Sequence, residues 1–249
     1  MDEHSKRSDA ERRAELKIAK SVWDGLEDEA KRQDFSHYRG VGRYAEPKKW
    51  DAIGMATLAK LDQIAPPGFW DIPRTALEWG PGGGSNIYAL RDRANLAYGV
   101  DVSEKNLEKA AQTLSDAGAQ IFKPIHLSNG LSDVTDRVAE PIDIFVSTAV
   151  FQHFPSQAFG VEVLELMHEL MAPGAIALVQ IRYDNGAEKF VPNTSLDQYA
   201  TRYITATSFA IDAFALHLKQ IGFVDIMACD FDARINYVTF CFSKPGDLA

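Results

Sequence analysis

Cysteine is scarce in this chain: Cys229 and Cys241 are the only two among 249 residues. They provide neither a disulfide framework nor the spacing of a metal site, so we expect a reducing, cytoplasmic location. Long hydrophobic runs are also missing, because no apolar stretch approaches the roughly 20 residues that a membrane-spanning helix requires. The N-terminus is charged. We therefore expect no targeting segment and no membrane partner.

Basic residues are outnumbered, with 26 lysines and arginines against 35 aspartates and glutamates, which gives a net charge of −9. That balance argues against a general nucleic-acid-binding protein, because such proteins concentrate positive charge. Apolar residues are plentiful, at 46% of the chain, which is enough for a complete core. The length suits one α/β domain with an accessory segment better than two domains.

A glycine-rich stretch organises the rest of the sequence. The apolar pair Ala76-Leu77 ends at a carboxylate, Glu78, and glycines follow at positions 80, 82, 83 and 84. From Ser85 the chain reads as the start of a helix. Glycine permits positive φ and lets a ligand approach the backbone closely, and a helix start offers unpaired N–H groups. This order predicts a strand, a tight turn and a helix start of the kind that binds nucleotides.

Three kinds of nucleotide-binding loop share this outline. A P-loop requires a lysine after its last glycine, and here Ser85 follows with no lysine near, which excludes that class. A dinucleotide loop, G-x-G-x-x-G, is met at Gly80 and Gly82 but not at its third position. The pattern acidic-x-G-x-G-x-G is met at every fixed position from Glu78 to Gly84. The stretch resembles the first motif of class I S-adenosylmethionine (SAM)-dependent methyltransferases, although an ordinary glycine-rich turn has the same outline.

A second carboxylate lies one predicted strand further on. Residues 95–101 read as a strand that ends at Asp101, about 20 positions beyond the glycine loop. An acidic residue at that distance is placed to accept hydrogen bonds from a ribose diol. Asp101 also begins the turn before the helix N-cap Ser103. The two roles are compatible.

Two helices and an aperiodic segment precede the glycine loop. A first helix is expected from about residue 12 to about Arg32, and its apolar stripe, which includes Trp23 and Leu26, is interpreted as packing against the body of the protein. The aromatic segment (residues 34–50) contains aromatic residues, two arginines and two glycines without any period. It could cover a substrate as a lid or form a surface connection, and both interpretations stay open. A second helix follows and stops before Pro66.

From residue 75 onward, strands and helices alternate. Strands are predicted at 75–78, 95–101, 120–125, 142–146 and 175–181, with Pro173-Gly174 ending the helix before the last of these; two further strands, at 224–231 and 237–243, have no helix between them. The predicted fold is α/β, a Rossmann-like doubly wound sheet of seven strands with a terminal antiparallel β-hairpin and an N-terminal helical cap. We expect residues 1–74 to form the cap or lid and residues 75–249 the SAM-binding domain.

The resemblance to class I methyltransferases extends over Thr75–Ser243, because segments at the fourth strand and before the fifth also fit in order and spacing. It implies in-line transfer of a methyl group from the sulfonium of SAM to a nucleophile, with S-adenosylhomocysteine (SAH) as the product. It assigns Glu78 to the methionine part of the cofactor and Asp101 to the ribose. The full set of cofactor-binding residues that it implies is Glu78, Gly80, Gly82, Gly84, Asp101, Val102, Ser128, Asn129, Ser147 and Thr148.

An oxygen acceptor must lose a proton, so a general base is useful. His153 is the best-placed histidine, because it follows the fourth strand on the ligand side of the sheet and its ordinary pKa is near neutral. A helix cap or packing under the cofactor is its alternative role, and His126 and His37 are weaker candidates for the base. Asp184-Asn185, after the fifth strand, lacks the second carboxylate that a divalent metal would require after the fourth, so we expect no metal.

The acceptor is narrowed by the residues that follow the fourth strand. Phe151-Gln152-His153-Phe154 stands where amino-methylating DNA enzymes carry Pro-Pro-aromatic and protein arginine enzymes carry two glutamates. Together with the acidic charge, this favours a small-molecule acceptor, a sugar or secondary metabolite, methylated on oxygen or nitrogen. An NAD(P)-dependent oxidoreductase and a non-catalytic SAM-binding protein stay open as alternatives, and a homodimer is compatible with the sequence. The substrate contacts that we expect are Tyr38, Arg43, Trp50, Arg182 and Tyr183.

Overall fold

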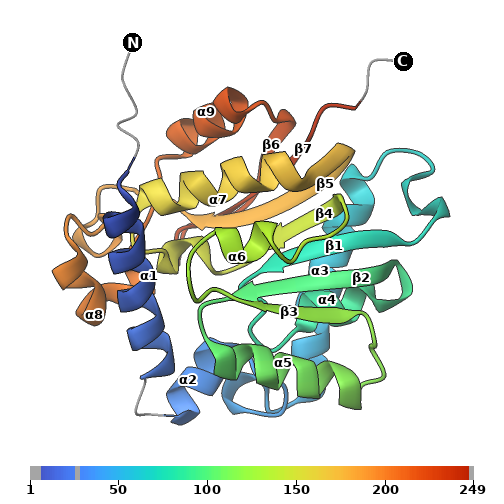
Figure 1. Cartoon of the computed structure of the whole chain (residues 1–249), viewed down its shortest axis with the longest axis horizontal. Coiled ribbons are helices and arrows are strands. Elements are labelled where there is room, and N and C mark those ends of the chain that lie inside the picture. Colours follow the sequence, from blue (N-terminus) through green and yellow to red (C-terminus); the bar gives the residue numbers. More distant parts are fainter. Residues whose placement is uncertain (1–6, 26–28, 247–249) are drawn as a thin grey trace.

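The computed structural model of the chain describes residues 7–25 and 29–246 and contains a seven-stranded sheet. The strands follow the order β3-β2-β1-β4-β5-β7-β6 across the sheet. β1 to β5 run parallel, and β7 is antiparallel to β5 and β6. The predicted doubly wound sheet with a terminal antiparallel hairpin is confirmed (Figure 1). The strands are β1 (Arg74–Trp79), β2 (Ala94–Asp101), β3 (Phe122–His126), β4 (Ile142–Ser147), β5 (Met171–Arg182), β6 (Val224–Asp232) and β7 (Tyr237–Ser243).

Helices cover both faces of the sheet (Figure 1). Side chains of α6, α7 and α9 share a core with one face, and those of α3, α4 and α5 share a core with the other. Within residues 7–25 and 29–246, no helix is long and apolar enough to cross a membrane. The helices are α1 (Asp9–Asp24), α2 (Glu29–Phe35), α3 (Pro47–Ile64), α4 (Ser85–Ala89), α5 (Glu104–Asp116), α6 (Ser132–Thr135), α7 (Gln157–Leu170), α8 (Tyr199–Arg202) and α9 (Ile211–Ile221).

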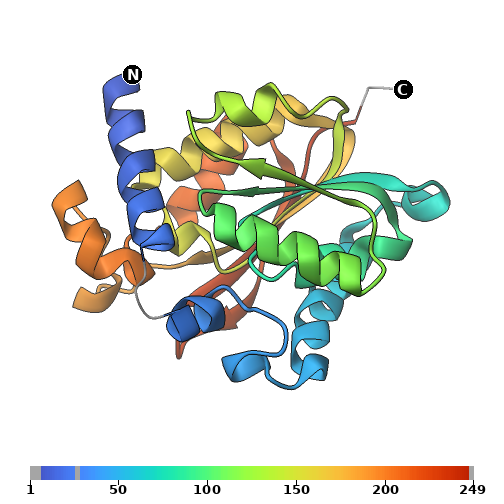
Figure 2. The same cartoon turned by 60° about the horizontal axis from the view of Figure 1, so that its bottom comes forward.

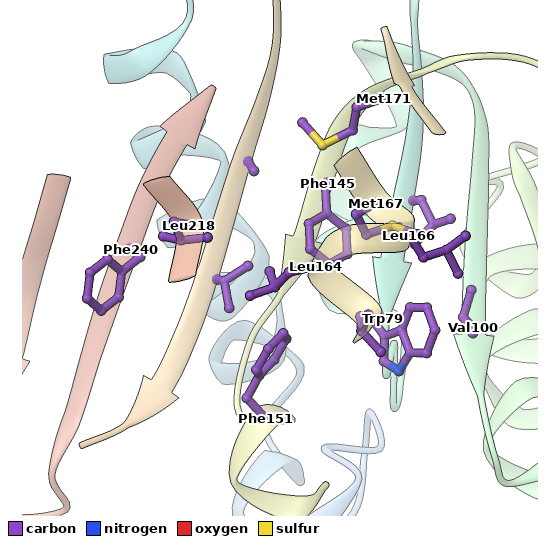
Figure 3. Close-up of a cluster of buried hydrophobic side chains, with 14 of the residues drawn as sticks. Trp79, Val100, Phe145, Phe151, Leu164, Leu166, Met167, Met171, Leu218 and Phe240 are labelled. Carbon is purple, nitrogen blue, oxygen red and sulfur yellow. The ribbon is translucent and has the colours of Figure 1, made fainter. Parts of the chain in front are cut away.

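Large apolar side chains fill the layer between the sheet and α7. Figure 3 shows Phe145 of β4 close to Met167 of α7, with Trp79 of β1 nearby. On the opposite face, Leu58 and Leu61 of α3 belong to the core that also covers β1 and β4. The helix before residue 75 is therefore part of the same packed layers as the strands that follow it.

The topology places one edge of the sheet where a ligand can bind. The chain leaves β1 toward β2 and β3, and then returns to β4 and β5 on the other side of β1. At such a reversal, the carboxyl ends of the parallel strands leave a crevice. Glu78, Asp101 and Ser147 stand at or next to the ends of β1, β2 and β4.

The N-terminal helix is shorter than predicted. α1 ends at Asp24, and the Gly25 N–H closes its last turn with a hydrogen bond of 3.0 Å. α2 then begins at Glu29. A single helix to Arg32 is therefore wrong, because a glycine ends the first one. Leu26, the predicted continuation of the apolar stripe, lies outside the described residues.

β5 begins earlier than predicted. α7 ends at Leu170, and Met171 already has extended backbone angles of −70° and 142°. Pro173 and Gly174 lie within β5 rather than between the helix and the strand. The prediction that Pro173-Gly174 ends the helix is therefore wrong, because α7 already ends at Leu170.

α1 lies beside α8 at one side of the molecule (Figures 1 and 2). Ala19 and Trp23 pack with Tyr199, Tyr203 and Ala206 in a small cluster of buried residues. The apolar stripe of α1 therefore packs against the insertion that follows β5, and this arrangement holds α1 over the end of the sheet.

Both edge strands carry features that weaken pairing with a further strand. β3 contains Pro124, which has no N–H to donate. β6 contains Asp225 and Asp230 at φ of 52° and 50°, and its register with β7 shifts around both residues. These kinks interrupt the outer row of backbone groups on β6.

Candidate functional site

A cavity with about 900 Å³ of empty space opens at the carboxyl ends of β1, β2 and β4. Its walls come from the glycine loop, α1, the aromatic segment, the chain after β4, and Tyr199 of α8. Segments far apart in the sequence thus meet over the edge that the topology predicts for a ligand.

The glycine loop takes a conformation that requires glycine. Gly80, Gly82 and Gly84 have φ of 72°, 50° and 85°, in the left-handed region that other residues avoid. A Cβ on Gly82 would collide with the carbonyl of Ser36, and one on Gly83 with the carbonyl of His37. The absence of side chains on the loop therefore leaves room for the backbone of the aromatic segment.

Glu78 is buried at the floor of the cavity. Its Oε1 accepts a hydrogen bond of 2.6 Å from Asn86 Nδ2, which also donates to Thr148 Oγ1 at 3.0 Å. Burial raises the pKa of Glu78 to about 8. Glu78 Oε2 and Asn86 Oδ1 are both buried without a hydrogen-bond partner in the described chain. Two acceptors are therefore available to a cationic or N–H donor on a ligand.

Asp101 faces the same cavity from the end of β2. Its Oδ1 accepts from the Ser103 N–H at 2.8 Å, and its Oδ2 accepts from Asn106 Nδ2 at 3.4 Å. Burial nevertheless raises its pKa to about 6, since desolvation outweighs these hydrogen bonds. The turn role and the cavity position predicted for Asp101 occur together.

His153 lines the cavity with both ring nitrogens engaged. Nδ1 lies 2.9 Å from the Tyr203 carbonyl and so carries the hydrogen, which leaves Nε2 to accept from Gln152 Nε2 at 3.1 Å. Its ring meets Trp23 edge-on at 5.1 Å. Burial lowers the pKa of His153 to about 4, so the ring is neutral near pH 7. To act as a base, His153 must release its Nε2 from Gln152 so that this nitrogen can take a proton from the methyl acceptor. The catalytic role of His153 stays a prediction.

His37, a weaker candidate in the sequence, also lines the cavity. It has φ of 57°, and its ring packs on Tyr44 at 4.8 Å. Burial lowers its pKa to about 4. The described chain offers no hydrogen-bond partner to its ring nitrogens. His126 lies outside the lining, where its Nε2 contacts Lys20 Nζ at 2.9 Å.

Several residues expected to bind the cofactor serve the surrounding structure. Val102 and Thr148 line the cavity, but Gly84 does not. Ser147 is fully buried and donates to the Trp79 carbonyl at 3.1 Å. The backbone N–H groups of Ser128 and Asn129 each donate to Asp133 Oδ2 at 2.7 Å, at the start of α6. The backbone N–H groups of Ser128 and Asn129 and the hydroxyl of Ser147 therefore bind protein acceptors. The cofactor roles of these three residues stay predictions.

The five residues expected to contact the substrate lie outside the cavity lining. Trp50 is fully buried against Tyr88, with ring centres 5.4 Å apart. Arg43 pairs with Asp34 at 2.8 Å and is exposed. Tyr183 pairs with Phe209 in an isolated bridge. The structure brings none of these side chains to the cavity wall.

Arg182 and Tyr38 take up buried positions. Arg182 donates to the Ile204 carbonyl at 3.1 Å and to the Tyr237 hydroxyl at 3.3 Å. In the described chain no carboxylate forms an ion pair with Arg182, and its Nε is buried without a partner. Tyr38 is 3% exposed, with its hydroxyl turned toward Asn106.

Three of the lining residues that the sequence analysis did not assign to the site shape it directly. Asn86 and Asn106 support the two carboxylates, each from the helix that follows the strand bearing its partner. Trp23 forms part of the wall from α1. The one signal in the sequence for Trp23 is its size, since it is the sole aromatic residue in the stripe of α1.

The Asp184-Asn185 pair forms a turn. Asp184 Oδ1 accepts from the Gly186 N–H at 2.8 Å, and Asn185 Oδ1 accepts from the Ala187 N–H at 3.0 Å. No group of three or more histidine, cysteine, aspartate or glutamate side chains in the described residues could hold a metal ion. Independence from metal stays a prediction.

Comparison with known proteins identifies the domain. Residues 77–177 match the model of a family described as a methyltransferase domain. An O-methyltransferase family protein from Burkholderia thailandensis has a similar structure, with a TM-score of 0.57 and 14% identity over 85% of this chain and 64% of that one. The CurJ carbon methyltransferase has a TM-score of 0.55 and 12% identity over 79% and 54% of the two chains. The SAM-dependent methyltransferase SibL has a TM-score of 0.51 and 17% identity over 77% and 56%. No curated protein sequence matches the chain.

These findings confirm the predicted resemblance to class I SAM-dependent methyltransferases and support SAM as the cofactor. At identities of 12–17%, the structural likeness shows the fold alone. The similar structures include both an O-methyltransferase family protein and a carbon methyltransferase. The type of acceptor therefore stays a prediction.

Proposed function

We propose that this chain transfers a methyl group from SAM to an oxygen or nitrogen atom of a small molecule, a sugar or secondary metabolite. Its residues 77–177 match a methyltransferase domain. One observation carries the proposal. Two carboxylates, the buried Glu78 and the half-buried Asp101, face one cavity from neighbouring strands, and one oxygen of Glu78 and one of Asn86 are buried without a hydrogen-bond partner in the described chain. Unsatisfied buried acceptors of this kind fit a ligand that brings its own donors.

The residues present fit the two polar ends of SAM. Glu78 and Asn86 offer oxygen atoms to the ammonium of the methionine part, and Asp101 accepts from the ribose hydroxyls. Val102, which lines the cavity among apolar residues, suits the adenine. When bound, the cofactor supplies a methyl group on a positively charged sulfur, which is reactive toward a nucleophile. The protein's own part is to align the reactants and exclude water.

We propose that residues 1–74 act as the cap of the site and residues 75–249 as the domain that binds SAM. Leu16 and Trp23 of α1 and His37 of the aromatic segment already form walls of the cavity. An acceptor that enters beside them meets a neutral His37 and a neutral His153, either of which can hold a hydroxyl group in place or take its proton. Arg182 lies outside the cavity lining and forms no ion pair with a carboxylate in the described chain, but its charge reaches His153 and so favours an acceptor that carries negative charge.

We propose a reducing, cytoplasmic compartment for the reaction, and the two free cysteines support this location. An NAD(P)-dependent oxidoreductase is the alternative, because the glycine loop partly meets the dinucleotide-binding pattern G-x-G-x-x-G. Isothermal titration calorimetry with SAM, SAH and NAD separates the two. The proposal expects heat with SAM and SAH but none with NAD. Tight binding of NAD alone would overturn it.

Glu78→Gln tests the role of the first carboxylate. The amide keeps the size of the side chain and its contact with Asn86, but it cannot balance the charge of an ammonium group. We expect the Kd of SAH to rise about tenfold or more, since a hydrogen bond to a charged group is lost. 5′-Methylthioadenosine, which lacks the amino-acid part, is the matched control ligand, and its Kd should stay within about twofold. Equal weakening of both ligands would contradict the assignment.

A further inference from the structure

Tyr38 was expected to contact the substrate, but its hydroxyl points to Asn106, the residue that donates a hydrogen bond to Asp101. The O–H lies 2.8 Å from Asn106 Oδ1, with the Lys105 carbonyl farther away at 3.3 Å. Tyr38 is 3% exposed and lies outside the cavity lining. Its position is therefore behind the wall of the cavity rather than on it.

The hydroxyl of Tyr38 determines how the amide of Asn106 is oriented. A tyrosine hydroxyl donates one hydrogen, and Asn106 accepts it through Oδ1. Asn106 Nδ2 is thereby directed to Asp101 Oδ2, 3.4 Å away. Asn106 is 4% exposed, and its backbone N–H is held by Ser103 Oγ at 3.3 Å. Without the hydroxyl, the amide could rotate and present its oxygen to the carboxylate.

Both oxygens of Asp101 are held by protein donors. Ser103 N–H donates to Oδ1 at 2.8 Å, and Asn106 Nδ2 donates to Oδ2. These two bonds fix the plane of the carboxylate and stabilise its ionised form. An ionised carboxylate in a fixed plane is what a pair of ribose hydroxyls requires.

The same short stretch also contacts the glycine loop. The carbonyls of Ser36 and His37 fill the spaces where a Cβ on Gly82 and Gly83 would be. Residues 36–38 thus contact the loop after β1 and, through Asn106, the carboxylate at the end of β2. The stretch lies on the cofactor side of the site at both points.

We propose that Tyr38 is a positioning residue for the ribose end of the cofactor site, acting through Asn106 on Asp101, and that it does not contact the acceptor. The inference depends on the proposed binding of SAM. It assigns Asn106 to the cofactor site and takes Tyr38 out of the substrate site.

Tyr38→Phe removes the hydroxyl and keeps the buried ring. We expect the Kd of SAH, measured by calorimetry, to rise about three- to tenfold, as for loss of one hydrogen bond. The 2′,3′-dideoxy analogue of SAH should bind wild type and Tyr38→Phe equally, because it has no hydroxyls for Asp101 to accept. The matched control is Tyr98→Phe, which likewise removes one buried tyrosine hydroxyl. The hydroxyl of Tyr98, on β2, accepts from the Ala139 N–H away from the cavity. Tyr98→Phe should bind SAH like the wild type.

Asn106→Ala removes the residue through which Tyr38 is proposed to act. If Tyr38 acts through Asn106, the double variant should bind SAH no more weakly than Asn106→Ala alone. Additive losses would overturn the proposal, as would equal weakening of SAH and its dideoxy analogue. An unchanged Kd for SAH in Tyr38→Phe would also overturn it and leave Tyr38 free for a role in the substrate site. A wild-type protein that binds neither SAM nor SAH would overturn the proposed function itself, and this result is distinct from the others.

Discussion

At the scale of single residues, the site combines two acids whose pKa values are raised to different extents. Burial takes Glu78 to about 8, while the hydrogen bonds of Asp101 limit its rise to about 6. Near pH 7 Asp101 is therefore mostly ionised and Glu78 mostly protonated before a ligand arrives. A ligand ammonium favours the ionised form of Glu78, so binding of the amino-acid part is linked to release of a proton.

This difference predicts distinct pH profiles for two ligands. 5′-Methylthioadenosine reports on Asp101, and its affinity should rise about tenfold from pH 5 to pH 7 and then level off, because one pH unit below its pKa only about a tenth of the carboxylate is ionised. SAH reports on both acids, so its affinity should keep rising to about pH 8. Calorimetry across this range measures both profiles. Asp101→Asn should flatten the profile of methylthioadenosine, and a profile unchanged by that substitution would contradict the assignment of Asp101.

At the scale of elements, the aromatic segment and the glycine loop form a single unit. The segment passes over the loop so closely that Gly82 and Gly83 have no room for a side chain. Gly82 also needs glycine for its φ of 50°, but Gly83 is not in the left-handed region. A substitution at Gly83 therefore tests the close approach without adding backbone strain.

Gly83→Ala should push the His37 carbonyl away from the loop. We expect the free energy of unfolding to fall by about 1–3 kcal/mol, the usual cost of overpacking, and the Kd of SAH to rise. Urea unfolding and calorimetry measure the two effects. Gly246→Ala is the control, because a Cβ there meets no atom within 4 Å, and its stability should stay within about 0.5 kcal/mol of wild type. Wild-type stability and binding in Gly83→Ala would show that the contact is not required.

The sequence predicted the elements whose signals are local. The alternation of strands, the glycine loop and Asp101 depend on spacing within about 30 residues, and the structure has them where they were expected. The hydrogen bond between Tyr38 and Asn106 spans 68 positions, and no period in the aromatic segment announces it. The hydrogen bonds from Ser128 and Asn129 to Asp133 are local, but the sequence did not predict them. An acidic residue in the first turn of a helix can accept from several nearby N–H groups, so its partners cannot be assigned from spacing alone.

At the scale of the whole molecule, buried ionisable groups make stability depend on pH. The pKa of Glu78 rises from an ordinary value of 4.5 to about 8, so the folded state keeps a proton that the unfolded state has released. Stability from this group is present at low pH and is lost as pH rises toward 8. The pKa values of His37 and His153 are lowered to about 4 from 6.5, so their effect on stability has the opposite sign and lies below pH 6.5.

The free energy of unfolding without ligand should therefore fall by about 1–2 kcal/mol between pH 6.5 and pH 8, since each unit of pH is worth at most 1.4 kcal/mol for one proton. Urea denaturation at several pH values measures this slope. Glu78→Gln should remove most of it, because an amide does not titrate. A slope that persists in the variant would mean that another buried group is responsible.

Pro124 and the kinks of β6 at Asp225 and Asp230 also determine how neighbouring molecules meet in concentrated solution. An uninterrupted outer strand is a template for fibre growth, since each new chain can add its own strand to it. Here both sides of the sheet are poor templates: one has no donor at Pro124, and the other bends out of register twice. Self-association through a continuous intermolecular sheet is therefore disfavoured, even when the protein is crowded.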